Sequence, residues 1–491
     1  YYVGESGWHD NDVFIDSGLG YGVIGGYNND ILGMSVVDEN SVTVNGGTVS
    51  GNVYGGYALT YFDHSMPAGQ DFIDANARYN TVTVSGSIVS DNVYGGYAAA
   101  DVPDILGNLD NIHVAADQNS VTVSNGTVSS NVYGGYVAAD AQDIPVGIGN
   151  IHISAYKNSV TVNGGTVSGN IYGGYADRST WVSDNTVTLS GTADMSKASL
   201  YGRNSEAHGT DNNLVIDSWS GKVKSLNNFD RIDFKNLTWK DEGTVLEIGD
   251  EAGSSLADTD IHLISLAGGQ DIHAGEYMYI IKSDGTLNTD SNKITVEENF
   301  TAGVAIDGTG EVSMDGQGNI KFEVTGTSVS DQINLVAENR AVAAAFVNQG
   351  TDLISDGLDA MNRDGNYGIK TFATVHGNRS QYDVNSDLKI NGWSTIVGVG
   401  SERKLGSGDF LWGIFYENGS GNYRTYNKFN NEFFRGDGSL LYNGGGIAAR
   451  FEKDNGIYAE GSLRAGTLKS EMTNALRDGA GNSYGYESES T

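Results

Sequence analysis

One sequence phrase occurs four times in the first 175 residues with small changes. It reads NSVTVNGGTVSGNVYGGY at residues 40–57 and returns at residues 80–97, 119–136 and 158–175. A degenerate copy precedes these at residues 11–27, and NTVTLSG at residues 185–191 begins another. Such repetition indicates a stacked architecture, because a short unit cannot bury its own apolar side and needs copies of itself to form a continuous core.

Each copy has the pattern of two short strands joined by a corner. In residues 41–44 valines alternate with hydroxyl residues, which favours a half-buried strand. Gly46 and Gly47 allow the positive φ of a tight corner, and after a second extended run we expect Gly55 and Gly56 to turn the chain again. The repeat therefore predicts a right-handed parallel β-helix with coils of about 18 residues.

Stacking of the copies would align two rows of side chains. The expected interior row is Val42, Val82, Val121 and Val160. A second row is Tyr57, Tyr97, Tyr136 and Tyr175. We expect both rows to serve packing; the alternative for the tyrosines is that they hold sugar rings or other planar partners.

The copies are separated by 40, 39, 39 and then 27 residues. Because the shortest interval cannot hold two coils, we interpret residues 58–79, 98–118, 137–157 and 176–184 as insertions that leave one corner of the solenoid. Insertions at one repeated corner fall side by side on one face, where binding sites are common. Two of them end in NIHVAADQ and NIHISAYK, whose alternation predicts hairpin arms.

Composition limits the classes of function. The 491 residues exceed one compact domain, and they include 69 glycines, three prolines and no cysteine. Lack of cysteine fits a protein that crosses a membrane unfolded. Residues 1–336 hold 13 Lys and Arg against 43 Asp and Glu, whereas residues 337–491 hold 15 against 19. The acidic first part repels nucleic acid, which is therefore excluded as a partner.

The chain changes character twice after the repeats. Residues 192–336 are expected to form further coils and a cap in which Trp219, Phe229, Phe234 and Trp239 cover the last coil; the alternative is an independent small β domain. Residues 338–361 carry a helical pattern that Gly350 interrupts. No run of 18 apolar residues is present, so any membrane contact is expected from strands.

Residues beyond Tyr367 predict long strands with one apolar face and one sparsely charged face. Phe410, Trp412, Ile414 and Tyr416 share one face of a strand. This pattern fits a barrel in lipid with a polar lumen, and a soluble β-sandwich is the alternative. The expected lumen residues are Glu417, Arg450, Glu452, Glu460 and Arg464.

Four segments in this region are ENRAVAAAFVNQGTDLI, GWSTIVGVGSERKL, GDFLWGIFYENGSGNYRTYN and YNGGGIAARFEKDNGIYAEGSLRAG. Their combination over residues 338–491 resembles the translocator domain of bacterial autotransporters, the type V secretion family. The repeats resemble the β-helical passenger of the same family. The implied domains are passenger repeats (1–191), further coils and a cap (192–336), a lumen or linker helix (337–365) and the N-terminal part of a translocator barrel (366–491).

The resemblance implies a partnership with outer-membrane lipid, with the barrel assembly machinery and with the secretion translocon. The barrel would lie in the bacterial outer membrane and carry the passenger to the cell surface as a non-catalytic adhesion or interaction rod, with a host or matrix ligand. A signal peptide and the remaining strands are expected outside the printed chain, because residues 367–491 accommodate about five strands of roughly 9 to 11 residues and the start of another. Isolated Asn339 and Asn348 in the helix favour a tethered passenger over a self-cleaved one.

Candidate chemistry in the sequence is sparse. Only His113 and His152 occupy matching positions among the histidines, which we interpret as copies of one surface position. A repeated DxxD provides weak candidates for calcium ligands, namely Asp101, Asp104, Asp140 and Asp143, and a solvated acidic rim is the alternative. No catalytic or cofactor-binding residue is nominated. The enzymatic alternative is a surface-displayed β-helical polysaccharide hydrolase or lyase.

Overall fold

The fold is rich in strands and consists of parallel sheets followed by one antiparallel sheet with two helices. The computed structural model describes residues 2–3, 9–17, 21–30, 33–61, 72–101, 111–139, 150–177, 181–205, 207–250, 252–267, 271–296, 299–349, 351–362, 367–383, 387–429, 432–478 and 481–491. Two compact units are distinguished, residues 1–302 with 307–327 and residues 303–306 with 328–491. The predicted combination of a β-helical solenoid and a C-terminal antiparallel sheet is confirmed.

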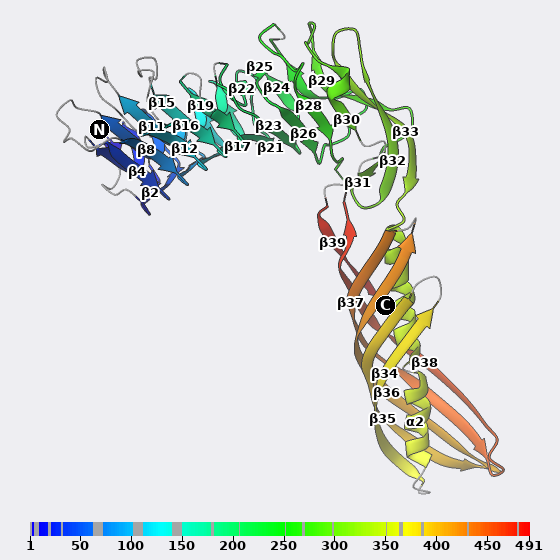
Figure 1. Cartoon of the computed structure of the whole chain (residues 1–491). Coiled ribbons are helices and arrows are strands. Elements are labelled where there is room, and N and C mark those ends of the chain that lie inside the picture. The colour runs from blue at the N-terminus through cyan, green and yellow to red at the C-terminus, as the bar shows by residue number, and fades with distance from the viewer. Residues whose placement is uncertain are drawn as a thin grey trace. The chain divides into compact units, whose positions relative to one another are not determined.

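The first unit is a solenoid of four parallel sheets, A to D, whose strands stack in chain order (Figure 1). Sheet A contains β1 (Tyr2–Val3), β3 (Gly22–Asp30), β7 (Val53–Tyr61), β11 (Val93–Asp101), β15 (Val132–Ala139), β19 (Ile171–Ala176), β22 (Ser199–Tyr201) and β25 (Ser225–Asn227). Sheet B contains β4 (Met34–Asp38), β8 (Phe72–Arg78), β12 (Asn111–Asp117), β16 (Asn150–Tyr156) and β20 (Trp181–Ser183). Sheet C contains β2 (Asp12–Ile15), β5 (Ser41–Asn45), β9 (Thr81–Ser85), β13 (Ser120–Ser124), β17 (Ser159–Asn163), β21 (Thr186–Ser190), β23 (Asn213–Asp217), β26 (Arg231–Lys235), β28 (Asp260–Leu263) and β30 (Ile294–Val296). Sheet D contains β6 (Thr48–Val49), β10 (Ile88–Val89), β14 (Gly126–Val128) and β18 (Gly165–Val167).

One coil passes through sheets C, D, A and B in turn, so the predicted coil of about 18 residues is wrong. Ser41 of β5 pairs with Thr81 of β9, 40 residues later. The stretches interpreted as insertions contain the ends of the sheet A strands and all of β8, β12 and β16. They are therefore part of the wall of the solenoid.

The predicted hairpin arms are also wrong. β12 and β16 pair with each other in parallel, with His113 opposite His152, and β12 pairs in parallel with β8 on its other side. Small apolar side chains fill the space between these strands and the ends of the sheet A strands, as Ala98, Ile112 and Ala116 illustrate. Alternation in the sequence indicates a two-faced strand but does not reveal its partner, because parallel and antiparallel neighbours bury the same face.

The coils shorten toward the carboxyl end of the solenoid. Ser159 pairs with Thr186, Thr186 with Asn213, and Asn213 with Arg231, so successive coils take 27, 27 and 18 residues. The interior valine row is confirmed, since Val42, Val82, Val121 and Val160 are in register and are at most 1% exposed.

A ladder of buried asparagines runs along the corner between sheets B and C. Its members are Asn40, Asn80, Asn119, Asn158, Asn185 and Asn212. In each step an Nδ2 donates to the Oδ1 of the next asparagine at 2.9–3.1 Å. The preceding residue has left-handed backbone, with φ of 57° at Tyr79 and 59° at Gln118, which turns the chain into the ladder. These bonds satisfy amides that would otherwise be buried without partners.

The ladder explains the glycine pair of each phrase. Gly55 and Gly56 lie within β7 and not at a corner, so their predicted role as turn residues is wrong. A Cβ on Gly56 would lie 2.5 Å from Asn80 Nδ2. The predicted corner at Gly46 and Gly47 does have positive φ, at 108° and 74°.

Substitution of Gly56 by alanine is expected to lower the free energy of unfolding by about 1–3 kcal/mol, the usual cost of overpacking. The reason is that the new methyl group meets the side-chain amide of Asn80. Chemical unfolding of the full chain measures the change. Gly316→Ala is the matched control, because a Cβ there has no neighbour within 4 Å; equal midpoints for the two variants would contradict the steric explanation.

The solenoid ends in a mixed sheet, sheet E. In spatial order its strands are β24 (Gly221–Val223), β27 (Thr244–Ile248), β29 (Tyr277–Ser283), β33 (Ile320–Val329), β32 (Ile306–Met314) and β31 (Asn299–Ala302), and a short 3₁₀ helix η1 (Ser291–Lys293) precedes β30. β29 and β33 pair antiparallel, which ends the parallel stacking. The four aromatic residues expected in the cap are buried, each at most 7% exposed.

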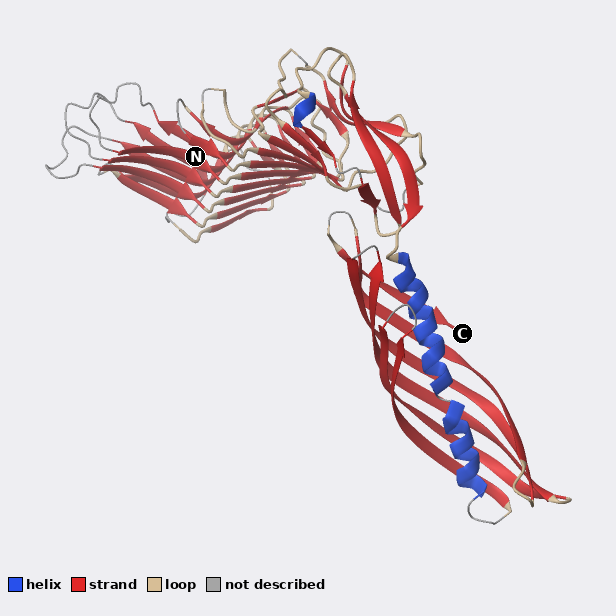
Figure 2. Cartoon of the chain, turned by 45° about the vertical axis from the view of Figure 1, so that its right-hand side comes forward, coloured by secondary structure: helices blue, strands red, loops and turns tan. Residues whose placement is uncertain are grey.

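The second unit is a six-stranded antiparallel sheet, sheet F, with helices along one face (Figure 2). Its strands are β34 (Gly368–Asp383), β35 (Asp387–Leu405), β36 (Gly408–Phe429), β37 (Glu432–Lys453), β38 (Tyr458–Arg477) and β39 (Ser483–Ser490). Helices α1 (Ile333–Gln349) and α2 (Thr351–Asn362) meet at Gly350, where the sequence predicted an interruption. β34 to β38 have 16 to 22 residues, so the predicted strand length was too short.

Neither helix in the described ranges is long and apolar enough to span a membrane.

Candidate functional site

Sheet F presents apolar side chains on the face that carries no helix. Ile414 is 51% exposed, Ile447 54% and Leu463 73%, and these three residues are neighbours across β36, β37 and β38. Alternate residues of the same strands, such as Leu411 and Phe415, are buried under the helices. The arrangement inverts that of a soluble sheet packed on a core, in which the face away from the core is the polar one.

The helix face of the sheet holds the charged residues that the sequence nominated for a lumen. Arg450 is 4% exposed, and its Nε and Nη2 donate to Glu460 Oε2 at 2.8 and 2.5 Å. Its Nη1 donates to Asp359 of α2, and Ser355 Oγ of α2 donates to Glu460 Oε1 at 2.5 Å. Glu452 accepts from Asn362 Nδ2 at 3.0 Å. Two strands are thereby joined to α2 by a buried ionic network.

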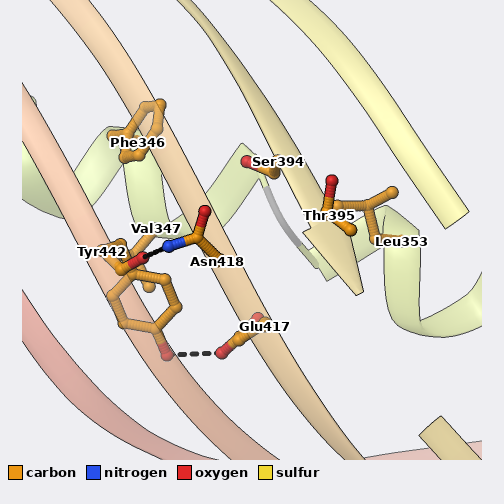
Figure 3. Close-up of a pocket in the computed structure, with 8 residues that line it drawn as sticks. All are labelled: Phe346, Val347, Leu353, Ser394, Thr395, Glu417, Asn418 and Tyr442. Carbon is orange, nitrogen blue, oxygen red and sulfur yellow. Dashed lines mark hydrogen bonds between the residues drawn. The ribbon is translucent and has the colours of Figure 1, made fainter. Parts of the chain in front are cut away.

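A second group lies where α1 gives way to α2. Arg464 Nη2 donates to the carbonyl of Val347 at 2.9 Å, and its Nη1 lies 3.4 Å from Glu417 Oε2. The Tyr442 hydroxyl donates to Glu417, as Figure 3 shows. The adjoining space of about 10 Å³ is lined by Phe346 and other residues of Figure 3. That volume is at the lower limit for one water molecule, so this group fastens the helix and offers no room for a substrate.

The amino-terminal part of α1 is held by uncharged partners as well. Glu338 Oε2 accepts from Thr425 Oγ1 at 3.0 Å and Asn427 Nδ2 at 2.5 Å. Asn339, which is fully buried, accepts from the Tyr423 hydroxyl at 2.9 Å. The sequence interpretation did not assign these contacts. The signal that could have found them is that residues 423, 425 and 427 share the strand parity of the nominated Glu417.

The calcium candidates are only partly described. Asp101 ends β11, and its side chain lies outside the described residues, as do Asp104, Asp140 and Asp143. Within the described ranges, no three His, Cys, Asp or Glu side chains are grouped as a metal site requires.

The matching histidines are brought together on sheet B. The rings of His113 and His152 stack at 5.0 Å between centroids, and His113 Nδ1 lies 3.0 Å from Asp74 Oδ1. Burial raises the pKa of nearby Asp117, although hydrogen bonds from the Tyr156 N–H and Ser154 Oγ act in the opposite direction. The pair is thus a repeated surface position with acidic neighbours.

Two tyrosine ladders cover sheet A. The first comprises Tyr54, Tyr94, Tyr133, Tyr172 and Tyr201, and the second comprises Tyr27, Tyr57, Tyr97, Tyr136 and Tyr175. In the interior of each ladder a ring stacks on both neighbours; Tyr97 lies 4.8 Å from Tyr57 and 5.1 Å from Tyr136 between centroids. Tyr94 meets Tyr97 edge to face at 5.4 Å. Because neighbouring tyrosines occupy both faces of the interior rings, a planar ligand finds a free ring face only at the ladder ends.

We expect the tyrosine ladders to make the β-helix sensitive to alkali. Burial raises the pKa of Tyr97 and of Tyr133 to about 12, from a usual value of 10.0. The unfolded chain therefore ionises first, and stability that is fully present below pH 10 is lost as the pH rises through about 12. Absorbance titration at 295 nm, with unfolding midpoints measured in parallel, tests this. A single titration of all tyrosines near pH 10 would contradict it.

Comparison of the chain with protein-family models, with curated proteins and with solved structures finds no match.

Proposed function

We propose that the chain belongs to an autotransporter, in which sheet F is part of an outer-membrane barrel and the β-helix is a passenger displayed at the cell surface. The barrel assembly machinery would insert the sheet, and the secretion translocon would deliver the unfolded chain to it. The observation that carries the proposal is the inverted sheet, with apolar side chains exposed on one face and buried charges on the other. Lipid would cover the first face, and the second would form the lumen around the helices.

The dimensions of the apolar face support this proposal. On β35 it runs from Trp393 to Arg403, a distance of ten residues. A strand that rises about 3.4 Å per residue and tilts by about 40° carries ten residues across about 26 Å, close to the apolar band of about 25 Å in outer-membrane barrels.

The form of the first unit supports a non-catalytic adhesion or interaction rod. Sheets A and B repeat the same outward side chains at each coil, so a host or matrix ligand would meet several copies of one surface. Multiple weak contacts of this kind give avidity without a deep pocket. Passenger folding outside the cell could proceed coil by coil from the cap, because each coil needs only the preceding coil as a template.

Ile447→Lys is expected to separate a lipid-facing sheet from a soluble sandwich. A lysine at mid-membrane costs about 2–4 kcal/mol of barrel stability, whereas one near the interface costs about 0–1 kcal/mol. Ala459→Lys, on the next strand close to the turn at residues 454–457, is the matched control. Urea unfolding of the full-length protein in detergent or lipid measures the difference. Equal effects of the two substitutions, or a gain in solubility with Ile447→Lys, would contradict lipid contact.

The cellular test uses the full-length protein in its host. The protein is expected in the outer-membrane fraction, and protease added to intact cells is expected to remove the β-helix while sparing sheet F. Binding of these cells to host tissue or matrix should fall after the passenger is removed. Recovery in the cytosol or periplasm would overturn the secretion proposal, and release of reducing sugar by the passenger would replace the adhesive role with an enzymatic one.

A further inference from the structure

A basic cluster lies on the outward face of sheet F, beyond the apolar residues. Its members are Arg379 of β34, Lys389 of β35, Arg424 of β36 and Arg435 of β37. Lys389 is directly opposite Arg424, and Arg424 is directly opposite Asp437. The cluster is set against a chain whose formal net charge is −34.

The carboxylates beside the cluster do not balance its charge. Asp437 is shared by two guanidinium groups, since it lies 2.7 Å from Arg424 Nε and 2.7 Å from Arg435 Nε. Asp387 lies 3.1 Å from Lys389 Nζ. Four cations therefore face two described carboxylates. Like charges directly opposite each other on neighbouring strands are destabilising, so Lys389 and Arg424 favour the arrival of an anion.

The cluster borders a hollow that has room for such an anion. The hollow has a volume of about 490 Å³, and its lining includes Arg379, Lys389, Asn391, Asn422, Arg424 and Ser439. Guanidinium groups and ammonium groups bind phosphate strongly, and amide and hydroxyl groups supply further donors. The ring of Tyr426 lies beside the cluster, 5.9 Å from Lys389 Nζ and from the Arg435 guanidinium.

We propose that this hollow binds the phosphate group of an anionic membrane lipid. The inference rests on the proposed function, because it needs the apolar face to be in lipid. Trp393 and Leu441 end the apolar face, and the next outward position on each strand toward the hollow is Asn391 and Ser439, respectively. A lipid whose chains lie along the apolar face would therefore have its headgroup phosphate at the level of the basic side chains.

The test uses the full-length protein in detergent micelles and native mass spectrometry. Phosphatidic acid, which carries a phosphate monoester, is titrated against phosphatidylcholine as the neutral-headgroup probe. The wild type is expected to retain phosphatidic acid at least about tenfold more tightly, and the Lys389→Ala/Arg424→Ala variant to bind it about 30-fold more weakly than the wild type does. Raised salt should narrow both differences.

The matched control removes the same number of outward charges from the opposite end of the sheet. It is Arg403→Ala/Lys453→Ala, which should retain phosphatidic acid as the wild type does. Lys389→Arg/Arg424→Lys preserves charge and should retain most of the affinity, and unchanged circular dichroism of all variants shows that they fold.

Three results would overturn the lipid site. These are equal retention of both lipids by the wild type, equal losses in the alanine variant and its control, and complete competition by millimolar inorganic phosphate, which would identify a free-anion site. If Ile447→Lys also proves harmless in lipid, the proposed function fails together with this site. If Ile447→Lys is harmful and retention is blind to the headgroup, only this site fails.

Discussion

Replacement of Asn119 by aspartate is expected to lower the free energy of unfolding of the β-helix by about 3–5 kcal/mol, the usual cost of an uncompensated buried charge. Asn119 Nδ2 donates to Asn158 Oδ1 at 3.1 Å and to the carbonyl of Ala77 at 2.9 Å. Its Oδ1 accepts from Nδ2 of Asn80 at 3.1 Å. A carboxylate oxygen in place of Nδ2 would face two acceptors, so the substitution would both break the ladder and bury a charge.

Urea unfolding of the full chain, followed by near-ultraviolet circular dichroism of the tyrosines, measures this loss. Asn119→Ala removes the hydrogen bonds without adding a charge and should cost less, about 1–3 kcal/mol. Asn45→Asp, at an exposed end of β5, is the control and should change stability little. Burial disfavours the charged form of the new carboxyl group, so the loss should shrink as the pH falls. A loss at Asn119→Asp no larger than at Asn45→Asp would contradict the role of the ladder.

The asparagine ladder also marks the limit of what the repeat alone predicts. Four near-identical phrases determine that coils stack and that valines fill the interior, because identical residues come into register. The length of the coil was missed because residues 72–78, 111–117 and 150–156 differ in sequence, although they follow the same spacing of 39 residues. The glycine pair was misassigned because the side chain that excludes a Cβ at Gly56 belongs to the next coil.

The charged residues of sheet F were selected on a local property. Alternation along a strand decides which side chains share a face, so Glu417, Arg450 and Arg464 could be grouped from the sequence. Their partners could not, because Asp359 and Val347 are on the helices and are distant in the chain. The geometry of a helix against a twisted sheet determines those pairs, and periodicity alone does not contain it.

Arg450→Leu is expected to destabilise the second unit by about 3–5 kcal/mol, because it leaves buried carboxylates without their counter-charge. Glu460 is 17% exposed on its side chain and would keep only the Ser355 hydroxyl as a partner. Thermal unfolding of the full-length protein in detergent micelles measures the effect. Arg450→Lys should recover part of the loss, since an ammonium group retains the charge but not the fork that bonds Glu460 and Asp359 together.

The double variant Arg450→Leu/Glu460→Leu distinguishes a charge effect from a packing effect. If the uncompensated Glu460 carboxylate causes the loss, its removal should restore much of the stability, because a buried ion pair replaced by apolar groups is often nearly neutral. Glu489→Gln breaks the exposed pair with Lys469, at 3.2 Å, and should change stability by only about 0–1 kcal/mol. If the double variant is as unstable as Arg450→Leu alone, the arginine stabilises the unit through the packing of its aliphatic stem beneath α2, and the ionic account of how the helix is held to the sheet is wrong.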